Sequence, residues 1–347
     1  MKHLLLAIPA LCIIACGSQK DTTTTPTTNT TNSVAVTSLA TAYANTITAA
    51  EMKTDLYIYA SDEFEGRDTG EPGQKKAVEF LKKEYQKMGV PSAYGTDNYF
   101  QPIPVAYFEG KAKNDSENVL AYIVGSEKPE EVIVISAHLD HVGHHDGEIF
   151  NGADDDGSGT VALLEMAEAF NQAKKDGKGP KRSILFLHVT GEEKGLFGSR
   201  FYSENPVFPL ANTVANINVD MIGRVDPEHK NEPNYVYVIG ADRLSTDLDA
   251  AVTKANKNLT DFKLDYKYND RNDPQRIYYR SDHYNFAKNG VPSVFFFSGI
   301  HEDYHKPTDT PDKIDYPLMT TRTKLIFHTA WEIANSDERI KVDRDGN

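Results

Sequence analysis

The sequence predicts an α/β fold, a three-layer αβα sandwich in which helices cover both faces of a mostly parallel mixed central sheet. Three observations lead to this prediction. Apolar runs of strand length alternate with stretches of helical periodicity along most of the chain. Several of these runs are apolar at every position, as expected of strands that are covered on both faces. The hydrophobic fraction of 39% is ordinary for a globular protein that buries a core.

The expected elements follow one another in a regular order. Between residues 75 and 88, apolar residues recur every three or four positions, which predicts a helix that ends at Gly89. The full set of predicted helices is Val36–Tyr59, Lys75–Met88, Gly159–Lys175, Leu196–Ser203, Asp247–Asn258, Asp282–Asn289 and Pro317–Asn335. The predicted strands are Phe100–Phe108, Val119–Val124, Val132–Ala137, Ile184–Val189, Val214–Val219, Tyr235–Ile239 and Val291–Phe297. No internal repeat or second linker interrupts them, so residues 34–347 are expected to form a single domain.

The first sixteen residues have a different composition from the rest. A short charged start precedes Leu4–Ile14, an apolar segment of signal-peptide length that is too short to span a membrane. The residues before Cys16 resemble the lipobox of bacterial lipoproteins, in which the cysteine is lipidated and becomes the mature N-terminus. We therefore expect residues 1–16 to be a lipoprotein signal peptide; the alternative is an ordinary signal peptide with a chance cysteine. Removal of Cys12 and acylation of Cys16 would leave no thiol for a disulfide, a nucleophile or a metal ligand.

Residues 17–33 predict a flexible tether, because eight threonines lie between Thr22 and Thr31 and nothing there can fill a core. Gln19–Asp21 loosely resembles a signal that sends lipoproteins to the outer face of the outer membrane. We therefore expect a lipid-anchored protein of the bacterial cell envelope, at the outer membrane, that faces the periplasm or the exterior. Its membrane contact would be through the N-terminal lipid alone.

The charge balance excludes one class of partner. The chain has 37 Lys and Arg against 51 Asp and Glu, a net charge of −14. Binding to phosphate backbones requires a basic face, so no nucleic acid partner is expected. The sequence carries no indication of oligomeric state.

Acidic and histidine side chains follow four of the predicted strands. Ligands of a doubly wound sheet bind beyond the carboxyl ends of its strands, so residues at these positions are expected to share one edge. A Gly-rich segment with three consecutive acids, Asn151–Gly159, also directly precedes a predicted helix. The residues at the strand ends are His138 and Asp140, Glu192 and Glu193, Asp220, and His301, Tyr304 and His305.

Carboxylates this close repel one another unless a cation joins them. The basic side chains in or beside these motifs are Lys194, Arg224 and Lys306, too few to balance the acids. A set of histidines and carboxylates fits zinc, and manganese or cobalt less well. Taken singly, an Asp in a Gly-rich loop is an ordinary turn residue. His188, inside an apolar strand, is interpreted as a core histidine.

Five motifs in order resemble a known family. They are His138-x-Asp140, Gly152–Gly159, Gly191–Glu193, Asn218–Gly223 and Tyr304-His305-x-x-x-Asp309. This set is similar to that of the two-zinc aminopeptidases of clan MH, a group that also includes glutamate carboxypeptidase II. Glutaminyl cyclases and the transferrin receptor ectodomain are relatives that lack the full metal set. The resemblance spans about residues 50–335 and implies a zinc-exopeptidase, phosphorylase/hydrolase-like fold with two zinc ions per chain, other divalent metals being possible.

The resemblance implies a role for each ligand position. His138 and Asp220 would bind one metal, and Glu193 and His305 would bind the other. Asp155, the middle acid of its loop, would bridge both. Its neighbours, Asp154 and Asp156, are the alternatives for that role.

The resemblance also implies the reaction, hydrolysis of peptides by a metal-bridged hydroxide. Glu192 would be the general base, and no covalent intermediate is needed. Tyr304 would donate a hydrogen bond to the oxyanion. Asp140 would orient His138 from behind, and Asp309 would do the same for His305.

Two further segments resemble parts of the family. Arg280, in Arg280–His283, is interpreted either as a contact for a substrate carboxylate or as half of a structural ion pair. Glu63–Arg67 would line the pocket or cap the fold.

We predict a zinc-dependent exopeptidase with peptide substrates, an aminopeptidase by preference. The alternatives are a carboxypeptidase or dipeptidase of the same family, a glutaminyl cyclase, and a binding protein that has lost catalysis. The last two lack ligands that this chain keeps.

Overall fold

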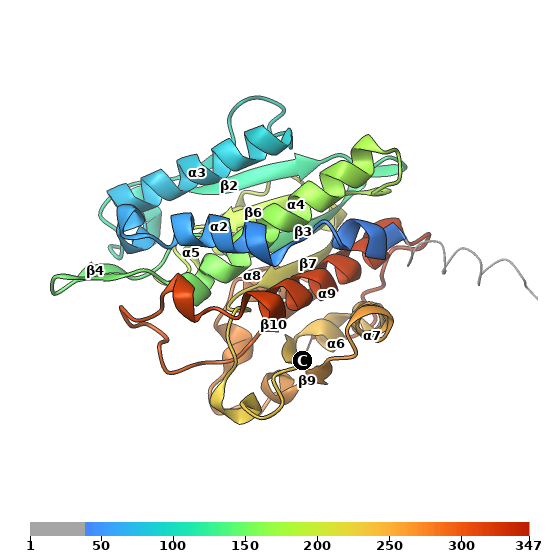
Figure 1. The fold of residues 1–347 in the computed structure, drawn as a ribbon. Helices are drawn as coiled ribbons and strands as arrows, with labels where there is room; N and C mark the ends of the chain where they lie inside the picture. Colours follow the sequence, from blue (N-terminus) through green and yellow to red (C-terminus); the bar gives the residue numbers. More distant parts are fainter. Residues whose placement is uncertain (1–38, 347) are drawn as a thin grey trace, which may run out of the picture.

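A computed structural model describes residues 39–346, in which an eight-stranded central sheet lies between layers of helices (Figure 1). The predicted signal peptide, Cys16 and the predicted tether over residues 17–33 lie outside the described residues. Within the described part, no helix combines the length and the apolar character needed to cross a membrane.

The central sheet is mixed and mostly parallel. Its eight strands are β1 (Phe100–Ile103), β2 (Ser116–Ile123), β3 (Lys128–His138), β6 (Arg182–Val189), β7 (Thr213–Val219), β8 (Tyr235–Ile239), β9 (Lys263–Asp265) and β10 (Ser293–Phe297). They lie in the order β1-β2-β6-β3-β7-β10-β8-β9. The four central strands β6, β3, β7 and β10 are parallel, as is the pair of β8 and β9. The other three pairings are antiparallel, so the predicted sheet type is confirmed.

Helices cover both faces of this sheet. One face carries α3 (Pro72–Met88), α4 (Gly159–Lys175) and α9 (Tyr316–Asn335), with α2 (Ala49–Tyr59) and α7 (Thr246–Leu259) packed against them. Figure 1 shows α2, α3, α4 and α9 crossing in front of the strands. The opposite face carries α5 (Phe197–Glu204) and α8 (His283–Ala287), and the short α6 (Ala241–Leu244) leads into α7.

Strand β3 explains why both faces need cover. Successive side chains of a strand point to opposite faces. Ile133 and Ile135 pack with the α4 layer, whereas Val132 and Val134 pack with the α5 and α8 layer. All four are buried, which is why the segment is apolar at every position.

Two predicted elements differ in the structure. The predicted helix Val36–Tyr59 is interrupted: residues 39–44 are helical, and α2 starts anew after Thr48, whose hydroxyl accepts a hydrogen bond from the Glu51 backbone N–H. This N-cap competes with a continuous helix. The predicted strand Phe100–Phe108 ends at Ile103, because Pro104 has no N–H to give to a neighbour, and Val105–Phe108 form a 3₁₀ turn.

A hairpin that the strand predictions omitted lies beside the carboxyl ends of the central strands. Its strands are β4 (Gly143–His145) and β5 (Glu148–Phe150), and it projects from the body, where Figure 1 labels β4. Asp146 and Gly147 form its turn with positive φ values of 53° and 85°. An Asp-Gly pair is a strong hairpin signal, so the sequence did contain this information.

Candidate metal centre and active site

The structure brings all five predicted metal ligands together at one edge of the sheet. His138 is the last residue of β3, and Asp220 directly follows β7. Glu193 lies in the loop between β6 and α5. Asp155 lies in the turn Ala153–Ser158, just before α4, and His305 in the loop after β10. The strand ends therefore converge as parallel topology predicts.

The first ligand group consists of His138, Asp155 and Asp220, all buried. His138 Nε2 lies 3.1 Å from Asp155 Oδ1 and 3.6 Å from Asp220 Oδ1. One atom from each residue falls within 4.8 Å of the others, a spacing that could hold a metal ion.

The second ligand group shares Asp155 with the first. Asp155 Oδ2 lies 3.0 Å from His305 Nε2, which is itself 3.2 Å from Glu193 Oε2. The two oxygens of Asp155 thus face different groups, which is the arrangement expected of a bridging carboxylate. A residue that the sequence reasoning missed also belongs here: His141 Nδ1 lies 2.8 Å from Glu193 Oε1.

The acids on either side of Asp155 have other partners. The carboxylate of Asp156 accepts hydrogen bonds from the backbone N–H groups of His138, Gly159 and Met221. Asp154 faces away from both groups: its Oδ1 accepts from the Gly223 N–H, and its Oδ2 lies 3.3 Å from His301 Nε2. Of the three consecutive acids, Asp155 alone faces both ligand groups.

The residues predicted to orient the ligands act differently from expectation. His138 Nδ1 lies 3.0 Å from the backbone carbonyl of Asp140, not from its carboxylate, which is 4.0 Å away. The Asp140 carboxylate instead accepts from Thr69 and from the Glu192 N–H. The predicted contact of Asp309 with His305 is wrong: its carboxylate accepts from the N–H groups of Asp154 and Asp155 and so fixes the bridging loop.

Glu192 lines the same pocket as the two ligand groups. Its backbone is fixed by the Asp140 carboxylate. Burial raises the pKa of Glu192 well above its usual range, and the nearby Asp282 and Glu193 carboxylates raise it further. A carboxyl with a raised pKa is suited to accept and return a proton.

Tyr304 and Arg280 lie at the exposed rim of the pocket. The Tyr304 ring stacks on the His305 ring at a centroid distance of 3.9 Å, and its hydroxyl accepts from Arg280 Nη2 at 3.3 Å. Burial and the charge of Asp155 raise the pKa of Tyr304, so the phenol stays protonated and can donate. Within residues 39–346, Arg280 makes no salt bridge to a carboxylate, so the structural ion-pair interpretation is not supported.

The pocket combines acidic and apolar walls. Its polar part is made of the ligands and Glu192, with Arg280 and Tyr304 at the edge. Its apolar part consists of Met221, Ile277, Phe295, Phe297 and Ile300.

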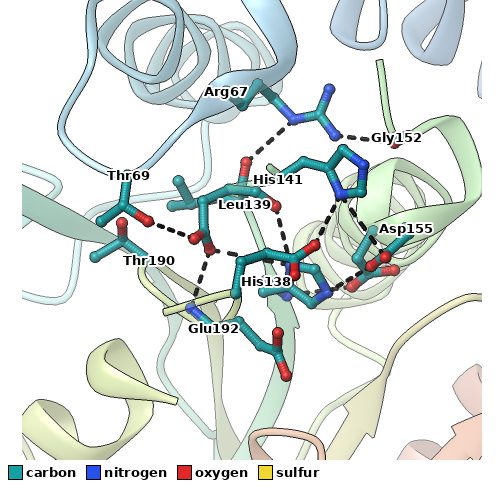
Figure 2. Close-up of polar contacts among 12 residues, drawn as sticks. Arg67, Thr69, His138, Leu139, His141, Gly152, Asp155, Thr190 and Glu192 are labelled. Carbon is teal, nitrogen blue, oxygen red and sulfur yellow. Dashed lines mark hydrogen bonds and ion pairs between the residues drawn. The ribbon is translucent and has the colours of Figure 1, made fainter. Parts of the chain in front are cut away.

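Several supporting residues were not predicted. Ser281 donates to Asp220 Oδ2 at 2.6 Å and accepts from Asn218 Nδ2, which lies in β7. Thr69, which is labelled in Figure 2, donates to the Asp140 carboxylate. His188 is the core histidine that was predicted: its Nε2 is 2.7 Å from the Tyr85 hydroxyl, and burial lowers its pKa to about 3.

Arg67 decides the role of Glu63–Arg67. Its buried guanidinium donates to the backbone carbonyls of Leu139, Asn151 and Gly152, on both sides of the β4–β5 hairpin. Figure 2 shows the contacts with Leu139 and Gly152. The segment therefore holds the ligand-bearing loops in place and is absent from the lining of the pocket.

The electrostatics of the site fit a bound cation. Burial alone would lower the pKa of His305, but Asp155 and Glu193 raise it to about 10. Burial and Asp155 would raise the pKa of Glu193, yet His141 and His305 hold it at about 2. The raised pKa values of His305 and His138 show that the acids favour positive charge at these two positions. Buried atoms of the second group, Asp155 Oδ2, Glu193 Oε1 and His305 Nε2, have no hydrogen-bond partner among the described residues.

The donor set identifies the class of protein. Histidine nitrogens and carboxylate oxygens without hydrogen-bond partners are suited to zinc. Their position at the strand ends, with the half-buried Glu192 carboxyl of raised pKa beside them, defines a metal-dependent hydrolase.

Comparison with known proteins gives the family. The profile of peptidase family M28 matches residues 118–330. The probable leucine aminopeptidase of Arthroderma otae is 30% identical over 274 residues, which is 75% of this chain and 71% of that protein. The chain therefore belongs to peptidase family M28 and is a zinc-binding metallopeptidase. Against two further fungal relatives, it spans only 55% of the relative's length.

Solved structures support the fold. The LapA aminopeptidase of Legionella pneumophila superposes with a TM-score of 0.66 at 22% identity, covering 88% of this chain and 76% of that one. The glutaminyl cyclase of Porphyromonas gingivalis superposes with a TM-score of 0.61 at 18% identity, covering 82% of this chain and 98% of that one. Because an aminopeptidase and a cyclase both share the fold, the reaction has to be argued from the site.

Proposed function

We propose that this chain is a two-zinc aminopeptidase that removes apolar residues from the N-termini of peptides. The observation that carries the proposal is the pocket itself, where two ligand groups share Asp155 and lie beside Glu192 and an apolar wall.

His138, Asp155 and Asp220 would hold one zinc, and Asp155, Glu193 and His305 would hold the other. When bound, such a metal pair lowers the pKa of an attacking water and polarises the scissile carbonyl. The orphaned atoms of the second group are consistent with this, because buried polar atoms without partners are rare in folded proteins.

Glu192 is proposed to take the proton from the attacking water and later to give it to the leaving amine. Its burial supports this role because a raised pKa lets the carboxyl hold that proton between the two steps. Tyr304 would donate its phenolic hydrogen to the negative oxygen that forms at the carbonyl. Its position on the His305 ring keeps the hydroxyl at the mouth of the pocket.

The walls of the pocket suggest which end of a peptide enters. The acids attract the ammonium group of a free N-terminus, and Met221, Phe295, Phe297 and Ile300 form an apolar surface for the first side chain. Arg280, which makes no salt bridge within the described residues, is available to a carboxylate further along a short peptide. A series of aminoacyl-p-nitroanilides should therefore be cleaved faster when the residue is Leu, Met or Phe than when it is Asp or Lys.

The exposed guanidinium of Arg280 also keeps a carboxypeptidase as the second candidate, because it could bind a C-terminal carboxylate. A peptide library with free or acetylated N-termini tests the choice. We expect cleavage of the free peptides and loss of cleavage after acetylation. Equal cleavage of both sets would contradict the aminopeptidase and favour the carboxypeptidase.

We further propose that Cys16 is acylated, that residues 1–16 are removed, and that residues 17–33 tether the enzyme to the cell envelope, at the outer membrane. The support is the sequence alone, since these residues lie outside the described part. Labelling cells with a radioactive fatty acid should mark the protein, and Cys16→Ser should abolish the label. Labelling that persists in the variant would contradict the proposal.

A further inference from the structure

We propose that His141 is a fourth protein ligand of the zinc in the second group, beside Asp155, Glu193 and His305. The inference rests on the proposed function, because it assumes the two-metal centre. It goes beyond the five ligands that the motifs imply, and it gives the second group one more protein ligand than the first.

Buried neighbouring residues hold the His141 ring beside the second ligand group. The residue is fully buried, and its backbone N–H donates to the Arg67 carbonyl at 3.2 Å. The ring occupies space that position 152 leaves free, because a Cβ on Gly152 would come within 2.5 Å of it. Arg67 fixes the Gly152 carbonyl as well, so the backbone on both sides of the ring is anchored (Figure 2).

Four buried atoms around one point lack hydrogen-bond partners among the described residues. They come from four residues and have the chemistry of zinc ligands: His141 Nδ1, Asp155 Oδ2, Glu193 Oε1 and His305 Nε2. One such atom could be an isolated defect of packing. Four that face one another indicate a common partner, and zinc can take four protein ligands together with a fifth position for the attacking water.

The spacing of these donors fits one ion. Zinc bonds of 2.0–2.2 Å in a tetrahedron put ligand atoms about 3.3–3.6 Å apart. His141 Nδ1 is 2.8 Å from Glu193 Oε1 and 3.7 Å from Asp155 Oδ2. His305 Nε2 is 3.0 Å from Asp155 Oδ2 and 3.2 Å from Glu193 Oε2. These distances bracket the tetrahedral value.

A rival role for His141 is hydrogen-bond donation that orients Glu193 from behind. The separation of 2.8 Å would allow it, but each of the two atoms is without a hydrogen-bond partner in the described structure. A ligand and an orienting donor differ in one measurable respect, a bond between Nδ1 and the metal.

Cadmium NMR of the whole protein tests that bond directly. The protein is prepared with ¹⁵N-histidine and loaded with ¹¹³Cd in place of zinc. We expect two cadmium signals, one coupled to a single histidine nitrogen and the other coupled to two. Two signals that each couple to one nitrogen would overturn the inference and leave the proposed function intact. Failure to bind two cadmium ions would instead count against the proposed function.

Zinc affinity of variants provides a second readout. His141→Phe keeps an aromatic ring but removes the nitrogen that could bind the metal. We expect the affinity for one zinc to fall at least about tenfold, because even the loss of a residue that only contacts a metal ligand lowers metal affinity by this much. The matched control is His328→Phe in α9, a buried histidine whose Nε2 also lacks a partner among the described residues but which has no acid beside it. If a folded His141→Phe variant binds both zinc ions with affinities within twofold of the unmodified protein, the proposal is contradicted. If the variant does not fold, the cadmium NMR experiment decides.

Discussion

The two ligand groups share one aspartate but are built from different parts of the fold. His138 and Asp220 of the first group sit at the ends of β3 and β7, in the centre of the sheet, and both are buried. Glu193 and His305 of the second group come from loops. The His305 side chain is 37% exposed and its backbone has a positive φ of 52°.

The two groups are kept in place by different means. The first group inherits its positions from hydrogen-bonded strands, and Ser281 adds a bond to Asp220. The second group cannot rely on the sheet, so Asp309 fixes the bridging loop, Tyr304 stacks on His305, and His141 is proposed to add a ligand. Loops are where local opening starts, which makes such additions useful.

Asp155→Asn should have the largest effect, because it removes the carboxylate common to both groups. We expect loss of both zinc ions and a fall in kcat/KM on the order of 10⁴-fold or more, since the water is no longer activated. Metal analysis and p-nitroanilide hydrolysis measure the two effects. Asp176→Asn, an exposed acid that accepts from Tyr43, is the control. Two zinc ions retained in Asp155→Asn would disprove the shared role.

Glu192→Gln should separate catalysis from metal binding. The amide cannot take a proton, so kcat should fall by about 10²–10⁴-fold while both zinc ions stay bound. Steady-state kinetics together with metal analysis checks this. A loss of metal would place Glu192 among the ligands, and a kcat within about threefold of the unmodified enzyme would exclude it as the base.

Ser281→Ala should weaken the first group alone. The serine hydroxyl donates to Asp220, and contacts behind a ligand typically contribute 10–100-fold to metal affinity. Competition with a fluorescent chelator should therefore report one weakened site and one unchanged site. The exposed Ser126, which donates to the Pro180 carbonyl far from the ligands, offers the control Ser126→Ala. Equal weakening of both sites would show that the two groups are not independent.

Zinc affinity should rise with pH by about tenfold per unit for each proton released. In the metal-free protein, Asp155 and Glu193 outweigh burial and raise the pKa of His305 to about 10, and Asp220 and Asp155 likewise raise the pKa of His138. Below those values the rings hold protons that zinc must displace, so binding weakens as the pH falls. Calorimetry in two buffers of different ionisation enthalpy at pH 7.5 counts the protons. A count near zero would contradict the paired charges.

The residues at strand ends were easier to predict from the sequence than the residues in loops. Residues at strand ends, such as His138 and Asp220, were predictable because parallel strands of alternating α/β sequence bring their carboxyl ends to one edge. Glu192 and Glu193 are the third and fourth residues after β6 and were predictable for the same reason. The fold class was predictable because the central strands are apolar on both faces.

Loop geometry was not predictable in the same way. The partners of Asp309 depend on how two separate loops meet, which no spacing along the chain encodes. His141 follows the His138-x-Asp140 motif directly and was passed over, although a further histidine at a strand end was a usable signal. The role of Arg67 depends on carbonyls of residues 139–152, and backbone acceptors leave no mark in a sequence.

The most direct test of the central claim is metal content and activity measured on the same sample of purified protein. The enzyme is assayed with leucine p-nitroanilide as isolated, after removal of metal by a chelator, and after return of zinc. We predict two zinc ions per chain, loss of hydrolysis on chelation, and recovery when the second equivalent is restored. One ion or none in the active enzyme, or hydrolysis that survives complete removal of metal, would contradict this prediction.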